Sequence, residues 1–205
     1  MKNKVCILDY GSGNVKSVYN MLVNIGADVK VSNDKLKIKN STHLILPGVG
    51  AFGSSMQKIH NNIPLDILEN EVINNSKPFL GICVGMQVLV DYGLEFGKNK
   101  GLGWIKGKCD KLSVKKEPLP HVGWNNISIN KNSKLFAELG DILDFYFVHT
   151  YAITPQKEDL ISSKTFYENN FCSSIEKDNI FGVQFHPEKS HLAGKILMKN
   201  FLKIN

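Results

Sequence analysis

The stretch from Lys77 to Gln87 is Lys-Pro-Phe-Leu-Gly-Ile-Cys-Val-Gly-Met-Gln, and the rest of the chain is organised around it. Phe79 to Cys83 is a short apolar run of the strand type, and the residues from Val84 onward suit a helix. Gly81 and Gly85 flank the cysteine, as a tight and strained turn requires. The pattern predicts a nucleophile elbow, in which the Cys83 thiol projects above the end of a sheet.

The chemistry expected at such a corner is that of a thiolate nucleophile. The positive end of the following helix favours the thiolate form of Cys83, and the Val84 N–H points toward any oxyanion that forms. The Gly-x-Cys-x-Gly pattern alone is equally typical of a buried cysteine at a glycine-rich turn.

A second pair of polar residues about a hundred positions later favours the catalytic interpretation. His186 and Glu188 follow an apolar strand and are two residues apart, so in extended chain they point to the same side. A carboxylate in that position can hold an imidazole in place. With Cys83 at the end of another strand, the order nucleophile, base and orienting carboxylate is complete.

The wider pattern predicts a single α/β domain spanning residues 1–205. Strands are expected at 5–9, 27–31, 43–46 and 79–83, with one helix between the first two and another between the last two, which indicates a largely parallel sheet. After Gly93 the chain changes to short strand-like pieces, with a predicted hairpin of 171–175 and 180–185 and a closing helix at 192–201.

Composition excludes several functions. The formal net charge is +6, but every basic residue is lysine, so the arginine fork typical of nucleic-acid readers is missing. No apolar run approaches the ~18 residues of a membrane span. The four cysteines, Cys6, Cys83, Cys109 and Cys172, have wide and irregular spacings, which argues against zinc and disulfides. We therefore expect a cytoplasmic protein that binds neither nucleic acid nor membrane and needs no metal or cofactor.

Six motifs, spread in order over nearly the whole chain, resemble those of class I glutamine amidotransferases, and in particular the glutaminase subunits of imidazole glycerol phosphate synthase. They are Asp9–Asn14, Leu46–Gly53, Gly81–Gln87, Pro120–Asn125, Tyr146–Tyr151 and Gln184–Ser190. The resemblance implies a single flavodoxin-like domain with central parallel strands, helices on both faces and antiparallel extensions.

The resemblance also implies hydrolysis of L-glutamine to glutamate and ammonia by a triad of Cys83, His186 and Glu188. The oxyanion hole would consist of the Val84 N–H and a second N–H from Val49 or Gly50, if that peptide turns inward. The residues that match substrate contacts of the family are Gln87, Glu95, Thr150 and Tyr151.

A partner subunit is implied as well, because free ammonia would be lost to water. The family passes it to a (β/α)₈-barrel cyclase subunit in a heterodimer. The residues that match interface positions are Asn14, Trp124, Asn125, Tyr146 and Lys189. Trp124 could instead be a core tryptophan, and Lys189 an ordinary surface lysine.

Three departures from the family pattern keep other functions open: Val84, Val122 and the segment Ser190–Gly194. They leave the chemistry intact but allow a paralogous glutaminase that supplies ammonia to a sugar-amidating enzyme of surface-polysaccharide synthesis. A free-standing cysteine hydrolase and a non-catalytic binding module are the remaining alternatives.

Overall fold

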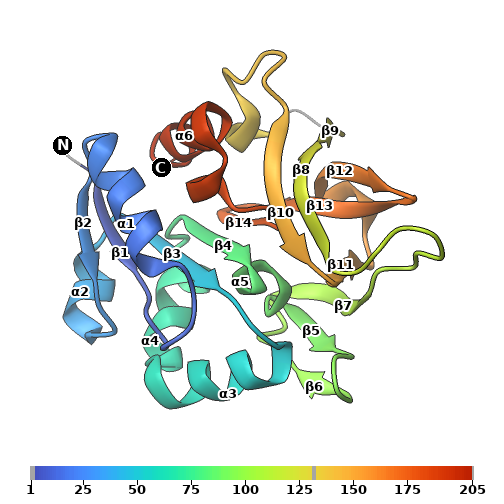
Figure 1. Ribbon diagram of the computed structural model, residues 1–205. Coiled ribbons are helices and arrows are strands. Elements are labelled where there is room, and N and C mark those ends of the chain that lie inside the picture. The colour runs from blue at the N-terminus through green and yellow to red at the C-terminus, as the bar shows by residue number, and fades with distance from the viewer. Residues whose placement is uncertain (1–2, 131–132, 205) are drawn as a thin grey trace.

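A computed structural model describes residues 3–130 and 133–204, and its central feature is a twisted eight-stranded sheet (Figure 1). The strands, in spatial order, are β2 (Asp28–Val31), β1 (Lys4–Ile7), β3 (His43–Gly48), β4 (Phe79–Cys83), β14 (Ile180–Val183), β13 (Asn169–Lys177), β12 (Ile161–Tyr167) and β9 (Ser128–Ile129). The first five run parallel, and the last three extend the sheet antiparallel. The predicted parallel centre with antiparallel extensions is confirmed.

Helices cover both faces of the parallel part, because its strands are buried on both sides. In Figure 1, α1 (Val15–Asn24) and α6 (His191–Phe201) lie on one face, while α3 (Phe52–Asn62) and α4 (Leu65–Glu69) lie on the other. The short α2 (Lys35–Asn40) packs beside α4, and a π-helical turn, Asn70–Asn74, continues α4.

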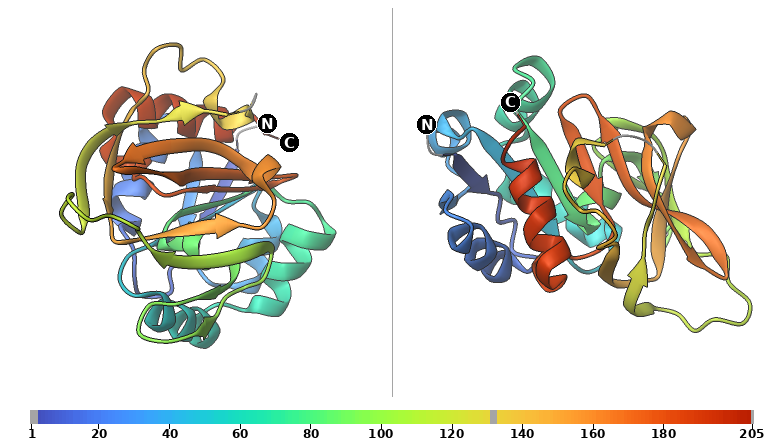
Figure 2. Two further views of the ribbon diagram at one scale, coloured as in Figure 1. Left: turned by 90° about the vertical axis from the view of Figure 1, so that its right-hand side faces the viewer. Right: turned by 90° about the horizontal axis from the view of Figure 1, so that it is seen from above.

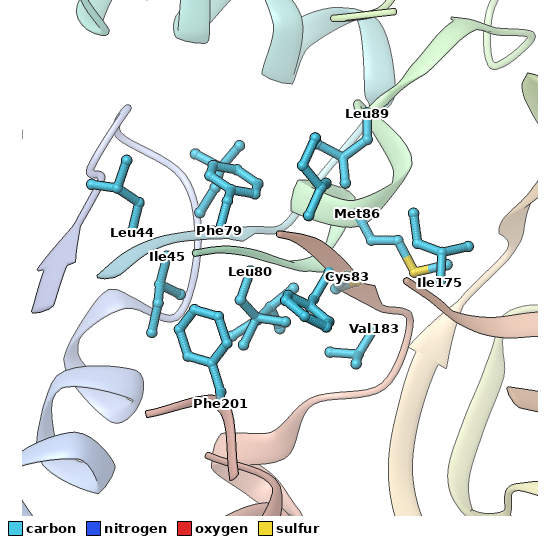
Figure 3. Close-up of a cluster of buried hydrophobic side chains, with 14 of the residues drawn as sticks. Leu44, Ile45, Phe79, Leu80, Cys83, Met86, Leu89, Ile175, Val183 and Phe201 are labelled. Carbon is cyan, nitrogen blue, oxygen red and sulfur yellow. The ribbon is translucent and has the colours of Figure 1, made fainter. Parts of the chain in front are cut away.

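The alternation of side chains along β4 explains why both faces need cover. Figure 3 shows Phe79 on the same side as Leu89, and Leu80 on the opposite side with Phe201 of α6. Phe79, Leu80 and Phe201 are fully buried. The strand therefore runs through the centre of the core, and its last residue, Cys83, is held there rigidly.

Two smaller sheets complete the molecule beyond the parallel strands (Figure 2). One pairs β8 (His121–Asn126) with β10 (Asp144–His149), and the other contains β11 (Tyr151–Pro155), β7 (Ile105–Lys111), β5 (Val90–Gly93) and β6 (Asn99–Lys100). The remaining elements are short: α5 (Val84–Gln87) and the 3₁₀ turns Lys134–Phe136, Glu158–Leu160 and Pro187–Lys189.

Several elements differ from the sequence-based expectation. The helix after Cys83 is a single turn, and Val90, expected on that helix, begins β5. The helices α2 and α3 were not predicted, nor were the strands β11 and β12. The strand β7 ends at Lys111. The predicted hairpin is confirmed, with Lys177 opposite Ile180.

Within the described residues, no helix is both long and apolar enough to cross a membrane.

Candidate active site

Cys83 occupies a strained corner between β4 and α5. Its φ is 56° and its ψ is −114°, a combination that L-residues rarely adopt. A Cβ at Gly81 would come within 2.4 Å of the Gly85 carbonyl oxygen, and one at Gly85 within 1.8 Å of the Leu46 carbonyl oxygen. Both glycines are therefore required by close backbone packing, as the elbow prediction supposed.

Strand register brings the other predicted residues to this corner. Gly48 pairs with Cys83 across β3 and β4, so Val49 and Gly50 continue directly beside the thiol. On the other side, Val183 pairs with Ile82, and the chain continues from there to His186. The His186 N–H donates to the Tyr146 carbonyl oxygen at 2.8 Å, which fixes the backbone on which the imidazole is mounted.

The predicted triad residues lie together and are buried. His186 Nδ1 lies 2.8 Å from Glu188 Oε1, and the two side chains are only 3% and 1% exposed. With Nδ1 engaged by the carboxylate, Nε2 is the ring nitrogen left for Cys83. Burial alone would lower the pKa of His186, but hydrogen bonding and negative charge from Cys83, and then from Glu188, raise this pKa to about 10. These contacts favour the protonated, imidazolium form of His186.

Asn14 has a role at this site that the sequence did not indicate. Its side-chain amide donates to Glu188 Oε1 at 3.2 Å, so the carboxylate is held from two sides. Asn14 immediately precedes α1, which begins at Val15, and lies 174 residues from Glu188. The resemblance suggested only an interface position for it.

The triad opens into a cavity of about 310 Å³. Its lining includes all nine residues predicted for the nucleophile, base, oxyanion hole and substrate contacts: Val49, Gly50, Cys83, Val84, Gln87, Glu95, Thr150, Tyr151 and His186. They come from the segment after β3, the elbow, the turn after β5, the junction of β10 and β11, and the segment after β14. The volume suits a small molecule of amino-acid size.

Gln87 is held in place rather than free to move. Its side-chain amide donates to the Tyr151 carbonyl oxygen at 2.8 Å and to Gln184 Oε1 at 3.1 Å. Gln184 in turn directs its own amide toward Cys83 Sγ at 3.7 Å. Gln184 was part of a recognised motif, but no role was predicted for it; the structure makes it a direct neighbour of the thiol.

Glu95 contributes a carboxylate to the lining of the cavity. One oxygen, Oε2, accepts from the Phe52 N–H at 2.7 Å, which anchors the carboxylate to the start of α3. A fixed negative charge in a small cavity can receive an ammonium group.

One wall of the cavity contains a neutral imidazole, His149, which was not predicted. His149 Nδ1 lies 2.9 Å from the Tyr151 carbonyl oxygen, and its Nε2 lies 3.1 Å from His121 Nδ1. Burial lowers the pKa of His149 to about 3 and that of His121 to about 4. Neither ring therefore adds positive charge to the site near neutral pH.

The residues matched to a partner interface fall into two groups. Trp124 is 48% exposed and stacks on His191 at 5.1 Å, and the Lys189 ammonium lies 5.3 Å from the centre of the Tyr146 ring. Trp124 and Tyr146 are themselves in edge contact, so these side chains form one exposed cluster. Trp124 is thus not a core residue.

Asn125 does not join this cluster. As the neighbour of Trp124 on β8, it points to the opposite face of the strand. Its amide donates to the Phe166 carbonyl oxygen at 3.0 Å and lies 3.3 Å from His121 Nε2.

Comparison with known proteins identifies the class of protein to which this chain belongs. Residues 6–204 match the sequence model of the family described as "Glutamine amidotransferase class-I". Solved structures agree on the fold: the chain resembles the structure of PurLQS from Thermotoga maritima with a TM-score of 0.76 at 18% identity, covering 99% of both chains.

Relatives that match over nearly their whole length identify the family within this class. The chain is 45% identical over 200 residues to the imidazole glycerol phosphate synthase subunit HisH 2 of Methanococcus maripaludis, covering 97% of this chain and 98% of that one. It is 43% identical over 203 residues to the subunit HisH of Pyrococcus furiosus, covering 98% and 100%. The chain therefore belongs to the class I glutamine amidotransferases, and within them to the HisH family.

Proposed function

We propose that this chain is the glutaminase subunit of an imidazole glycerol phosphate synthase. It hydrolyses L-glutamine to glutamate and ammonia, and passes the ammonia to a (β/α)₈-barrel cyclase subunit for histidine biosynthesis. The observation that carries the proposal is the convergence on one small cavity of a strained cysteine, a buried histidine held by a carboxylate, and a second carboxylate fixed by a backbone hydrogen bond.

The reaction follows from the placement of the groups. The Cys83 thiolate attacks the side-chain amide carbon of glutamine, and the resulting oxyanion is stabilised by the Val84 N–H and by an N–H from Val49 or Gly50. Imidazolium His186 donates its proton to the departing nitrogen, and ammonia leaves. Water, deprotonated by His186, then attacks the thioester, and glutamate and the free thiol are released.

The lining of the same cavity supports a proposal for substrate binding. Glu95 receives the α-ammonium group of glutamine, Thr150 and Tyr151 lie at its carboxylate, and Gln87 positions the substrate while supporting Gln184. Glu188 orients His186 and does not itself exchange a proton.

The cyclase is proposed to dock on the exposed cluster of Trp124, Tyr146, Lys189 and His191, and on Asn14. The whole chain, residues 1–205, acts as a single domain in this proposal. The four cysteines have no disulfide partner within the described residues, which suits a reducing compartment and the cytoplasm.

Glutaminase activity of the isolated chain, measured again with a matching cyclase barrel and its nucleotide ligand, tests the proposal. We expect low activity alone and a steep rise with the complete complex, and no activity from Cys83→Ala in either case. High unassisted activity would favour a free-standing cysteine hydrolase. Inactivity under both conditions would favour the sugar-amidating partner and its different acceptor.

A further inference from the structure

A buried tyrosine lies behind the proposed oxyanion peptide. Tyr10, just after β1, is completely buried, and within residues 3–130 and 133–204 its hydroxyl has no hydrogen-bond partner. Burial raises the pKa of Tyr10 to about 12, against a hydrogen-bonding contact with Ser55 of α3 that lowers it; this contact lies outside normal hydrogen-bond geometry and leaves the hydroxyl without a full partner. The hydroxyl thus keeps its proton. An unpaired donor in the core costs stability in this state, so its presence calls for an explanation, such as a hydrogen bond that it makes in another state of the protein.

The position of the hydroxyl points to its use. A Cβ on Gly48 would lie 2.6 Å from the Tyr10 hydroxyl, 2.6 Å from the Gly85 nitrogen and 3.0 Å from the Val84 Cβ. The bare backbone of Gly48 is therefore all that fits between the tyrosine and the elbow. Tyr10 and Gly48 are absent from the described lining of the cavity, whereas Val49 and Gly50 belong to it. The hydroxyl approaches the strand end from the buried side.

The geometry of a peptide links the two sides. The carbonyl of Gly48 and the N–H of Val49 belong to one rigid plane and point in opposite directions. If the N–H faces the cavity, the carbonyl faces the buried side, where the unpaired hydroxyl lies. The chain beyond is free to turn, because Gly50 has a φ of 99° and Val49 is 41% exposed.

We propose that Tyr10 is a positioning residue for the oxyanion hole, whose hydroxyl donates to the Gly48 carbonyl oxygen in the state that presents the Val49 N–H to Cys83. The inference rests on the proposed function, because it presupposes an oxyanion formed at Cys83. Tyr10 touches neither substrate nor thiol and acts only through the peptide.

Tyr10→Phe removes the hydroxyl and keeps the ring. We expect kcat for glutamine hydrolysis in the complete complex to fall about ten- to a hundredfold, less than the 10²–10³ typical of losing an oxyanion donor itself. The KM for glutamine should stay unchanged, because the substrate-binding residues are untouched. The melting temperature should stay the same or rise, because the variant no longer buries an unpaired hydroxyl.

Thr165→Val is the matched control. Thr165 of β12 is also buried, and its hydroxyl also has no partner within the described chain. It is not among the residues that line the cavity. Its removal should leave kcat unchanged while the melting temperature stays the same or rises.

If the wild-type protein is active, either of two results would overturn this inference and leave the proposed function standing. An unchanged kcat in Tyr10→Phe would show that the Tyr10 hydroxyl does not position the oxyanion hole. A lower melting temperature, reproduced by Ser55→Ala, would assign it a structural bond to Ser55. Wild-type protein without glutaminase activity in any complex would overturn the proposed function, and this inference with it, before any variant is compared.

Discussion

At the scale of single residues, Cys83 and His186 act as one charged pair. Burial works against a charged imidazole, and only the two acceptors beside it, the thiolate and the Glu188 carboxylate, outweigh that effect. The protonation of His186 therefore depends on both Cys83 and Glu188, and neither can be changed without consequence for the imidazole.

Removal of the thiol should be visible at the imidazole. In Cys83→Ala, we expect the pKa of His186 to fall well below the raised value of the native protein, because its largest favourable partner is lost while burial remains. Histidine NMR titration measures this shift directly. Cys6→Ala is the control, since Cys6 lies buried in β1 and burial raises its pKa to about 11. A His186 pKa that is equal in both variants would contradict the pairing.

Raised protonation of His186 also contributes to stability, with a definite sign. The folded protein binds this proton more tightly than the unfolded chain, whose histidine has a pKa of about 6.5. The contribution is fully present below pH 6.5 and is lost as the pH rises toward about 10.

Asn14 is the second residue whose effect can be isolated. Asn14→Ala should lower kcat about ten- to a hundredfold, since a hydrogen bond to a charged group is worth about 1.5–3 kcal/mol and Glu188 would lose one of its two supports. Steady-state kinetics of the complete complex measure the loss. Asn61→Ala, at an exposed position of α3, should have no effect. Equal rates for the two variants would show that His186 alone holds the carboxylate.

At the scale of elements, the elbow is shaped by backbone packing. Gly85 lies against the Leu46 carbonyl of β3, and Gly81 against Gly85 itself, so β3, β4 and α5 meet without side chains between them. Nothing at this junction can be displaced by a change of rotamer.

Gly85→Ala should therefore destabilise the protein by more than about 4 kcal/mol, or prevent folding, because the added methyl would overlap a carbonyl. Gly140→Ala is the control: its φ is 55° and there is space for a methyl group, so the cost should be only about 1–2 kcal/mol. Urea denaturation of both variants provides the comparison. Similar midpoints would mean that the elbow can relax around a side chain.

The sequence predicted what is encoded locally. Gly81, Cys83 and Gly85 lie within five residues, and His186 and Glu188 within three, so motif and spacing were enough to predict the sharp corner at Cys83 and the contact between His186 and Glu188. Helix α2 was missed because only Ile38 is buried in its lysine-rich segment. Helix α3 was missed because its first turn contains Gly53, Ser54 and Ser55, which are poor helix formers.

Contacts between distant segments could not be predicted in the same way. The bond from Asn14 to Glu188 and the approach of Tyr10 to Gly48 depend on the order of strands in the sheet, which no local pattern specifies. The helix after Cys83 was expected to be longer because Val84, Val88 and Val90 suit either a helix or a strand.

At the scale of the whole molecule, the exposed cluster is joined to the site by hydrogen bonds of the main chain and of the Ser190 hydroxyl. Tyr146 accepts from the His186 N–H through its carbonyl, and its own N–H donates to the Ser190 hydroxyl, which donates to the His186 carbonyl oxygen at 2.6 Å. A partner seated on Tyr146 would therefore press on the segment that carries His186, the proposed catalytic base.

Trp124→Ala should weaken binding of the cyclase barrel by about thirtyfold or more, the loss typical of an aromatic at the centre of an interface. Titration calorimetry measures the affinity, and the basal glutaminase rate of the isolated variant should stay unchanged. Phe166→Ala removes another exposed aromatic, 65% exposed on β12, and should leave the affinity unaltered. Equal losses for both would place the partner elsewhere.

The backbone contacts at the elbow also determine how the site responds to heating. Flexible active sites often lose their shape at temperatures where the rest of a protein is still intact. Here the nucleophile sits at the junction of two central strands, with no loop of its own that could loosen first. On heating, the Cys83 corner should therefore keep its shape until the whole sheet melts.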